Sequence, residues 1–256
     1  MPRTVWALGA VSFFTDVAGE MVFPLLPRFL AGMSGAGAAA VGVVEGIADA
    51  VSHLAKPWAG KRSDRGRRKP FVLFGYALSG AARPALAAAG SVVAVAFIRS
   101  IDRAGKGIRS APRDALIAAA APPEGLARAF SVQRAMDHAG AVAGPLVASG
   151  LLALGLSMRQ VFLVAAIPGV LALLAIGFFV REDGVAPAPA AASPVSAPDA
   201  PLPPRLTAFL WVAFVFALGS STDALLLLRA EAMGVAPAAI PLVWMLLHVV
   251  KVAASY

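Results

Sequence analysis

Long apolar stretches alternate with short polar connections along most of the chain. Eight stretches are long enough to form membrane helices, at residues 5–30, 38–59, 70–89, 91–111, 127–153, 158–180, 206–228 and 238–256. A helix needs roughly 20 mostly apolar residues to cross a bilayer, because it rises only about 1.5 Å per residue. The pattern therefore predicts an all-α polytopic membrane protein.

The composition supports a membrane protein and narrows its chemistry. Of 256 residues, 59% are hydrophobic and only 14% are charged, and the mean hydropathy is +0.78. Soluble domains carry about 45–50% apolar and about 25% charged residues, so an ordinary soluble enzyme and a disordered chain are excluded. The chain has no Cys, no His pair at metal-ligand spacing and no complete phosphate-binding loop. We predict that it is not an enzyme and holds neither a metal nor a cofactor.

The positive charge indicates the orientation in the membrane. The net charge is +8, and residues 61–69 alone contain six cations and one anion. Basic residues in short loops stay on the cytoplasmic side. The amino terminus is therefore predicted to be cytoplasmic, with the chain integral to the plasma membrane (a bacterial inner membrane). Since topology accounts for the charge, no nucleic-acid partner is expected.

Two lobes are predicted on either side of a Pro- and Ala-rich cytoplasmic linker at residues 183–205. Residues 1–182 are expected to form a six-helix bundle, and residues 206–256 an incomplete second bundle of two helices. The second lobe repeats two short motifs of the first: Thr15-Asp16 recurs as Thr222-Asp223, and the pair His53 and Lys56 recurs as His248 and Lys251. We therefore expect the chain to be either a fragment or a truncated product, and a full-length form to be monomeric.

Charged residues in the apolar stretches follow helical steps of three and four, which place them on single faces. Such groups are costly in lipid and normally face a protein interior or a wet cavity. We expect the first, second, fourth and fifth stretches to share a charged interior, and the third, with only Arg83, and the sixth to face lipid. Static pairing of helices is the alternative role for these charges. Candidates for proton or cation coupling are Asp16, Glu20, Glu45, Asp49, Asp137 and Asp223. Candidates for substrate contact or charge pairing are Arg99, Asp102, Arg103, Lys106, Arg134 and His138.

Two motifs resemble those of the major facilitator superfamily (MFS) of secondary transporters. The loop at residues 60–69 resembles the family's signature loop between helices two and three, with Gly60, Asp64, Arg65, Gly66, Arg67 and Arg68 as its gating residues. The segment containing Gly140, Gly144 and Pro145 resembles the fifth-helix motif of proton-driven antiporters. Gly66 is expected to permit a tight reversal, and the glycines four apart to let a second helix approach closely. One departure stands in the fourth stretch, where Ile101 precedes Gly105 by four residues in place of the family's frequent arginine.

The resemblance implies transport of a small solute by alternating access, and the fifth-helix motif favours proton-coupled export of small organic molecules. The basic fourth stretch favours an organic-anion or metal-chelate carrier as the alternative. A membrane sensor or scaffold without transport is the third possibility.

Overall fold

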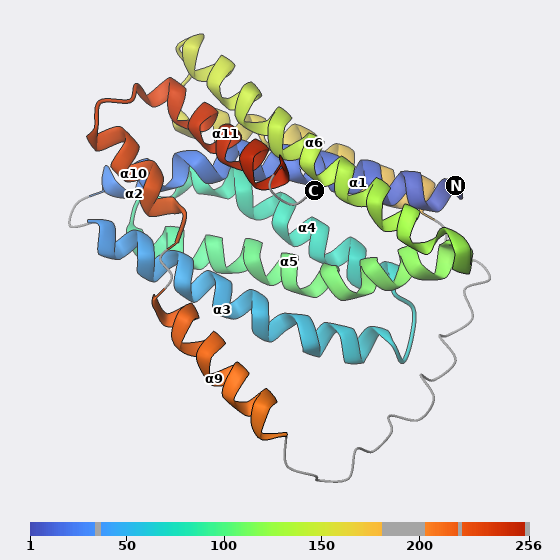
Figure 1. The fold of residues 1–256 in the computed structure, drawn as a ribbon. Helices are drawn as coiled ribbons and strands as arrows, with labels where there is room; N and C mark the ends of the chain where they lie inside the picture. Colours follow the sequence, from blue (N-terminus) through green and yellow to red (C-terminus); the bar gives the residue numbers. More distant parts are fainter. Residues whose placement is uncertain (34–36, 181–202, 220–221, 254–256) are drawn as a thin grey trace.

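Every regular element in the described residues (1–33, 37–180, 203–219 and 222–253) is a helix in the computed structural model (Figure 1). The first apolar stretch forms α1 (Arg3–Val22), a 3-10 turn (Phe23–Leu25) and α2 (Leu26–Ala31). The next three form α3 (Ala38–Ser63), α4 (Lys69–Ala85) with the turn Leu86–Ala88, and α5 (Val92–Ala120). After the turn Pro123–Gly125 come α6 (Leu126–Ala153), α7 (Met158–Val164) and α8 (Ala166–Phe179). The rest is α9 (Pro204–Gly219), α10 (Ala224–Ala232), the turn Pro237–Ala239 and α11 (Ile240–Ala253).

Side-chain caps set two of the helix starts. The Ser91 hydroxyl accepts a hydrogen bond from the Ala94 amide at 3.2 Å and begins α5, and Ser157 forms a capping box with Gln160 at the start of α7. Such caps satisfy amides that have no partner inside the helix. The predicted helix at 91–111 therefore starts where expected, but it continues to Ala120.

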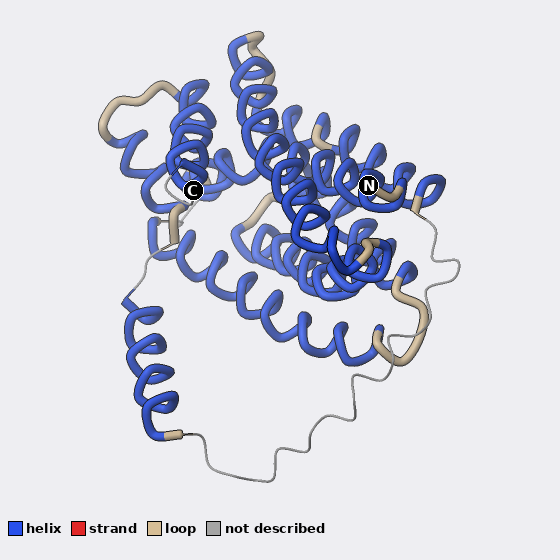
Figure 2. The backbone as a smooth tube through the Cα atoms, turned by 45° about the vertical axis from the view of Figure 1, so that its right-hand side comes forward, coloured by secondary structure: helices blue, strands red, loops and turns tan. Residues whose placement is uncertain are grey.

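The seventh predicted stretch was wrong as a single helix. Instead of one helix over 206–228, α9 ends at Gly219 and α10 begins at Ala224, whose amide bonds the Thr222 hydroxyl at 3.4 Å. The predicted linker at 183–205 lies mostly outside the described residues, and its last two positions already belong to α9, which starts at Pro204. Proline suits the first turn of a helix because its missing amide would have no partner there. Figure 2 shows α9 set apart from the other helices, as does Figure 1.

Within the part of the chain that the structure describes, four helical segments are long and apolar enough to cross a membrane, at residues 3–31, 38–63, 69–88 and 158–179. Helices α5 and α6 are also long but carry more charge, and they pack against α3 and α4 and against α1, respectively. Much of the charged face of α5 is therefore buried against α3 and α4, whereas Arg128 and Arg134 of α6 remain exposed.

The buried apolar residues of the described chain form two large clusters at opposite ends of the long helices and a small third one of Leu227, Ile240 and Trp244. One large cluster gathers Val5, Leu8 and Val11 of α1 with Leu116 and Ile117 of α5. The other large cluster gathers residues 17–30 of the first segment with the opposite ends of α3, α5 and α6. Charged residues of α1, α3, α4 and α5 lie between the two large clusters, at what we call the charged level of the bundle. They are Asp16, Glu20, Glu45, Asp49, Arg83, Arg99, Asp102, Arg103, Lys106 and Arg109.

Glycines let the helix backbones touch at this level. A Cβ added to Gly105 of α5 would lie 2.5 Å from the Gly75 carbonyl oxygen of α4, and one added to Gly107 would lie 2.5 Å from the Ser52 carbonyl oxygen of α3. Any side chain larger than hydrogen is thus excluded at both positions. Close seating of this kind is typical of helix pairs in membranes, and it holds α3, α4 and α5 together.

Candidate functional site

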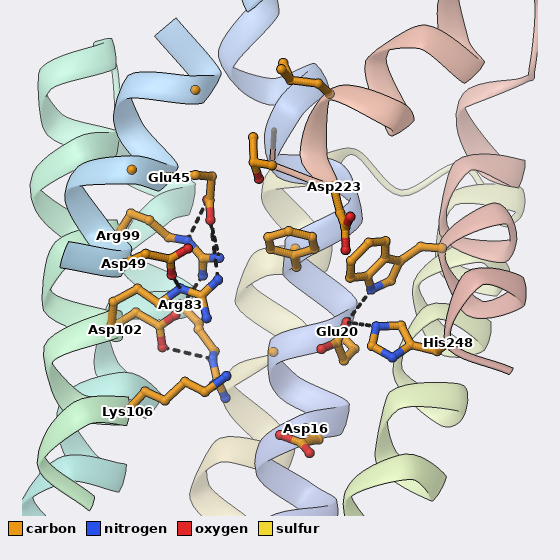
Figure 3. Close-up of a pocket in the computed structure, with 18 of the residues that line it drawn as sticks. Asp16, Glu20, Glu45, Asp49, Arg83, Arg99, Asp102, Lys106, Asp223 and His248 are labelled. Carbon is orange, nitrogen blue, oxygen red and sulfur yellow. Dashed lines mark hydrogen bonds and ion pairs between the residues drawn. The ribbon is translucent and has the colours of Figure 1, made fainter. Parts of the chain in front are cut away.

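A cavity of about 710 Å³ opens between helices α1, α3, α4 and α5 on one side and helices α10 and α11 on the other (Figure 3). Its volume falls in the usual range for ligand pockets, about 300–1,000 Å³. Most of the side chains that line it are charged. The lining residues are Asp16, Gly19, Glu20, Phe23, Gly42, Glu45, Gly46, Asp49, Arg83, Arg99, Asp102, Arg103, Lys106, Arg109, Thr222, Asp223, Leu225, Trp244 and His248.

Arg99 of α5 is the centre of a buried ion-pair network on one wall. Its Nε and Nη2 atoms donate to the two carboxylate oxygens of Glu45 at 2.8 and 3.1 Å, and its Nη1 donates to Asp102 Oδ2 at 2.8 Å. The Glu45 side chain is 3% exposed and the Arg99 side chain 6%. A two-pronged bond between guanidinium and carboxylate fixes the geometry as well as the charge, so this pair braces α3 against α5.

Two further arginines extend the network. Arg103 contacts Glu45 and Asp49 of α3, each at 3.4 Å. Arg83 of α4 lies 3.4 Å from Asp102 and donates to the Thr15 carbonyl oxygen of α1 at 2.8 Å. The expectation that the third apolar stretch faces lipid was therefore wrong at Arg83, which is 6% exposed and lines the cavity. The sequence predicts an interior helix face from charged residues spaced three and four apart. A single arginine has no such spacing, so the position of Arg83 could not be predicted.

Farther along α5, two cations line the cavity without a carboxylate contact in the described residues. Arg109 donates to the Ser79 hydroxyl at 2.6 Å and lies over the Tyr76 ring, 4.5 Å from its centroid. Lys106 extends into the cavity and is exposed there (Figure 3). The α5 wall thus carries a local excess of positive charge at this end.

Acidic side chains of α1 and α10 face that wall. Asp16 and Glu20 lie one turn apart on α1, and Asp223 precedes α10 (Figure 3). Glu20 accepts a hydrogen bond from Trp244 Nε1 at 2.5 Å and lies 3.8 Å from His248 Nε2, both on α11. Residues after the predicted linker therefore contribute directly to the cavity.

Helix α6 packs closely against the face of α1 that carries Asp16 and Glu20. A Cβ on Gly140 would lie 2.6 Å from the Phe13 carbonyl oxygen and 2.9 Å from Asp16 Cβ. One on Gly144 would lie 2.7 Å from the Val17 carbonyl oxygen and 2.8 Å from Glu20 Cβ. The two glycines of the fifth-helix motif thus lie against the residues that carry the two carboxylates. Pro145, next to them, is buried within α6.

The charges of α6 do not reach this cavity, contrary to the prediction that the fifth stretch shares the charged interior. Asp137 accepts a hydrogen bond from Gln133 at 2.5 Å, Arg134 is exposed, and His138 is half-buried. None of these lines the cavity. Asp137 lies one turn before Gly140 on the side of α6 that packs against α1, where its partner Gln133 also donates to the Ser12 hydroxyl at 3.5 Å. Arg134 lies on another side of α6 and is exposed.

The repeated motifs are placed unequally. Asp16 and Asp223 both line the cavity, as does His248. His53, by contrast, is exposed and bonds the Asp49 carbonyl of its own helix at 2.8 Å, and Lys56 does not line the cavity. The side chain of Lys251 lies outside the described residues.

The basic loop connects α3 and α4 at the end of the bundle. Asp64 lies 3.8 Å from Arg68, whose side chain is buried, while Arg65 and Arg67 are exposed. A Cβ added to Gly60 would lie 3.5 Å from Ala111 Cβ of α5. Gly66 donates to the Ser63 carbonyl at 3.3 Å, but its φ is not positive. Gly66 thus lies in the reversal between α3 and α4, but its backbone conformation suits other residues as well.

Among the residues that the structure describes, no group of three or more His, Asp or Glu side chains is arranged to hold a metal ion. A helical bundle with apolar ends that surrounds a charged cavity between two lobes has the architecture of a membrane carrier. A family model for the Major Facilitator Superfamily matches residues 8–255, and the chain belongs to this family. Its members are transporters rather than enzymes, integral to the membrane.

Relatives and solved structures agree with this assignment. An uncharacterized MFS-type transporter of Methanocaldococcus jannaschii is 34% identical over 236 residues, covering 90% of this chain and 57% of the relative. An uncharacterized protein of Mycobacterium tuberculosis is 32% identical over 251 residues, covering 94% and 61%. The chain thus spans about three fifths of the length of these curated relatives.

Among solved structures, the peptide transporter POT in complex with sulfate matches with a TM-score of 0.63 at 19% identity, over 92% of this chain and 48% of that one. A bacterial homolog of the human lysosomal transporter Spinster matches with a TM-score of 0.60 at 17% identity, over 69% and 43%. The predicted all-helical MFS-type fold is confirmed by these matches.

Proposed function

We propose that this chain moves a small polar solute across the plasma membrane by alternating access and that proton movement drives export of the solute. The observation that carries the proposal is the cavity itself, in which charged side chains of both lobes face one another between two apolar clusters. Charged groups are retained at such a depth when they face protein or water and act on a solute or ion.

The coupling role suits Asp16 and Glu20 best among the candidate acids. Glu45 and Asp102 are fully engaged by arginines, and breaking a buried ion pair by neutralising one partner is costly. Asp16 has no hydrogen bond or ion pair in the described part of the chain, and Glu20 contacts the second lobe through Trp244 and His248. Movement of Glu20 would therefore act directly on these two contacts with α11.

Contacts between the lobes support a state that is closed on one side. Arg28 of α2 pairs with Glu231 of α10, the Ser149 hydroxyl donates to the Ala238 carbonyl at 2.6 Å, and the rings of Phe23 and Trp244 lie 4.7 Å apart. With the amino terminus in the cytoplasm, these contacts lie toward the outer face. Alternating access requires them to open and close while the solute is held between the lobes.

The proposal is tested with the purified chain in liposomes whose lumen is more acidic than the surrounding buffer, so that outward proton flow drives solute uptake by antiport. The liposomes are incubated with a cellular metabolite extract, and mass spectrometry identifies solutes that accumulate relative to empty liposomes. We expect accumulation that a protonophore abolishes and that Asp16→Asn and Glu20→Gln reduce at least tenfold. Asp114→Asn, on α5 away from the cavity, is the matched control.

The outcomes separate the candidate functions. Accumulation that is insensitive to the pH gradient would contradict proton coupling but not transport. Solute binding without any flux would favour a sensor over a carrier. An organic-anion carrier is favoured by the cations at the Lys106 end of the cavity, and accumulation restricted to anions would support that alternative.

A further inference from the structure

We infer that the solute is a small zwitterion, whose anionic group is bound by Lys106 and whose cationic group is bound by Asp16. The inference rests on the proposed function, because it assigns the cavity described above to a solute. It is carried by two opposite charges that line one cavity and have no partner in the described part of the chain.

Lys106 is the accessible cation of its wall. The neighbouring Arg99 and Arg103 are engaged by the carboxylates of Glu45, Asp49 and Asp102, and these bonds fix them in place. Lys106 makes no such bond within the described residues, and its side chain extends from α5 into the cavity (Figure 3). Arg109 lies one turn farther along α5, where its guanidinium donates to the Ser79 hydroxyl and lies over the Tyr76 ring. Since neither partner carries a negative charge, the positive charge of Arg109 adds to that of Lys106.

Asp16 is the corresponding anion on α1. Its side chain is half-buried, lines the cavity at the same end as Lys106 and forms no ion pair in the part of the chain that the structure describes (Figure 3). The α6 backbone at Gly140 packs directly against the side of α1 that carries Asp16, because a Cβ at Gly140 would lie 2.9 Å from Asp16 Cβ. This contact fixes the position of Asp16. Asp16 and Lys106 do not pair with each other, so the space between them is available to a solute.

The two charges together select a zwitterion over a singly charged solute. An anion at Lys106 would be repelled by the Asp16 carboxylate, and a cation at Asp16 would be repelled by Lys106 and by Arg109 behind it. A solute with both charges replaces each repulsion with an attraction. A site built for two charged groups also rejects a solute that lacks one of them, because the unmatched side chain then loses water without gaining a partner.

Binding of a matched series to the full chain in lipid nanodiscs tests the inference. The zwitterions are glycine, 4-aminobutyrate and 6-aminohexanoate, and the singly charged counterparts are butyrate and butylamine. Isothermal titration is expected to show at least one zwitterion binding at least tenfold more tightly than either counterpart. Equal affinity for a counterpart, or no binding by any zwitterion, would overturn the inference.

Variants of the two residues add a readout that a purely structural role would not change. Lys106→Gln and Asp16→Asn should each weaken zwitterion binding at least tenfold, while Lys106→Arg and Asp16→Glu should retain most of it. Lys106→Gln should also shift preference toward butylamine, and Asp16→Asn toward butyrate. Preference is compared within one variant, so a partly misfolded preparation does not hide the shift. A uniform loss for all probes would contradict the assignment.

Control variants remove a like charge outside the cavity. Lys61 lies in the last turn of α3, and Asp114 pairs with Arg113 on α5. Neither Lys61→Gln nor Asp114→Asn should alter the affinities. A loss in the controls equal to that in the cavity variants would overturn the inference. Zwitterion binding that depends on both cavity residues, without flux in liposomes, would uphold the inference and refute transport. Flux of singly charged solutes, without flux of any zwitterion, would support transport and refute the zwitterion inference.

Discussion

Replacing Gly144 with alanine tests whether the α1–α6 contact positions the acidic face of α1. The added methyl carbon would lie 2.7 Å from the Val17 carbonyl oxygen and 2.8 Å from Glu20 Cβ. Carbon atoms in contact settle at about 3.5–4.0 Å, so α1 must retreat by on the order of 1 Å. Overpacking of this kind costs about 1–3 kcal/mol, and each kcal/mol corresponds to about 2–4 °C for a chain of this size. We expect the apparent melting temperature to fall by about 2–12 °C, measured by thermal unfolding in detergent.

The matched control and a double variant make this prediction specific. Gly150 lies on the same helix with nothing within 4 Å of its Cβ position, so Gly150→Ala should leave the melting temperature unchanged or raise it slightly. If α1 retreats, Glu20 also moves away from Trp244, and Trp244→Phe should then destabilise Gly144→Ala less than it destabilises the unaltered chain. Gly144→Ala melting at the same temperature as Gly150→Ala would refute the reasoning.

Two ion pairs yield further predictions. Arg99→Met leaves the carboxylates of Glu45 and Asp102 without their shortest contacts. It should lower the free energy of unfolding by about 3–5 kcal/mol, and Arg99→Met/Glu45→Gln should recover part of that loss; no recovery would argue against a charge effect. Arg28→Glu should reduce flux in liposomes by opposing Glu231 across the lobes, and Arg28→Glu/Glu231→Arg should restore it. Equal flux in the unaltered chain and both variants would exclude the pair as an inter-lobe contact.

Long apolar runs predict helices well because length and hydropathy are local properties of the chain. Helix ends depend on single side chains and are harder to predict. The predicted helix at 206–228 is interrupted before Ala224, where Thr222 bonds the first amide of α10. The inner part of α5 looks too charged for a membrane helix in isolation, yet Arg109 is 5% exposed because α4 supplies Ser79 and Tyr76 to receive it.

The spacing of charges predicts which residues share a helix face, but not what that face meets. Steps of three and four correctly grouped Glu45 and Asp49, and the structure places both in the cavity. The same kind of spacing on α6 gave Arg134 and His138, which lie away from it. The difference comes from the glycines of α6, which fix its rotation about its own axis. Arg83 shows the opposite case, since a lone residue has no spacing to interpret.

The close glycine contacts divide the first lobe into two tightly seated groups, α1 with α6 and α3 with α4 and α5. Within each group the backbones touch, as at Gly144 and at Gly105, so neither group can be rearranged without separating helices. Between the groups, Arg83 of α4 donates to the Thr15 carbonyl at 2.8 Å, and Arg113 of α5 donates to the Ser12 hydroxyl at 3.4 Å. Packed interfaces change by discrete shifts of rigid units and not by continuous deformation. Any change in the width of this cavity within the first lobe is therefore expected to occur between these two groups, with Arg83 at their junction.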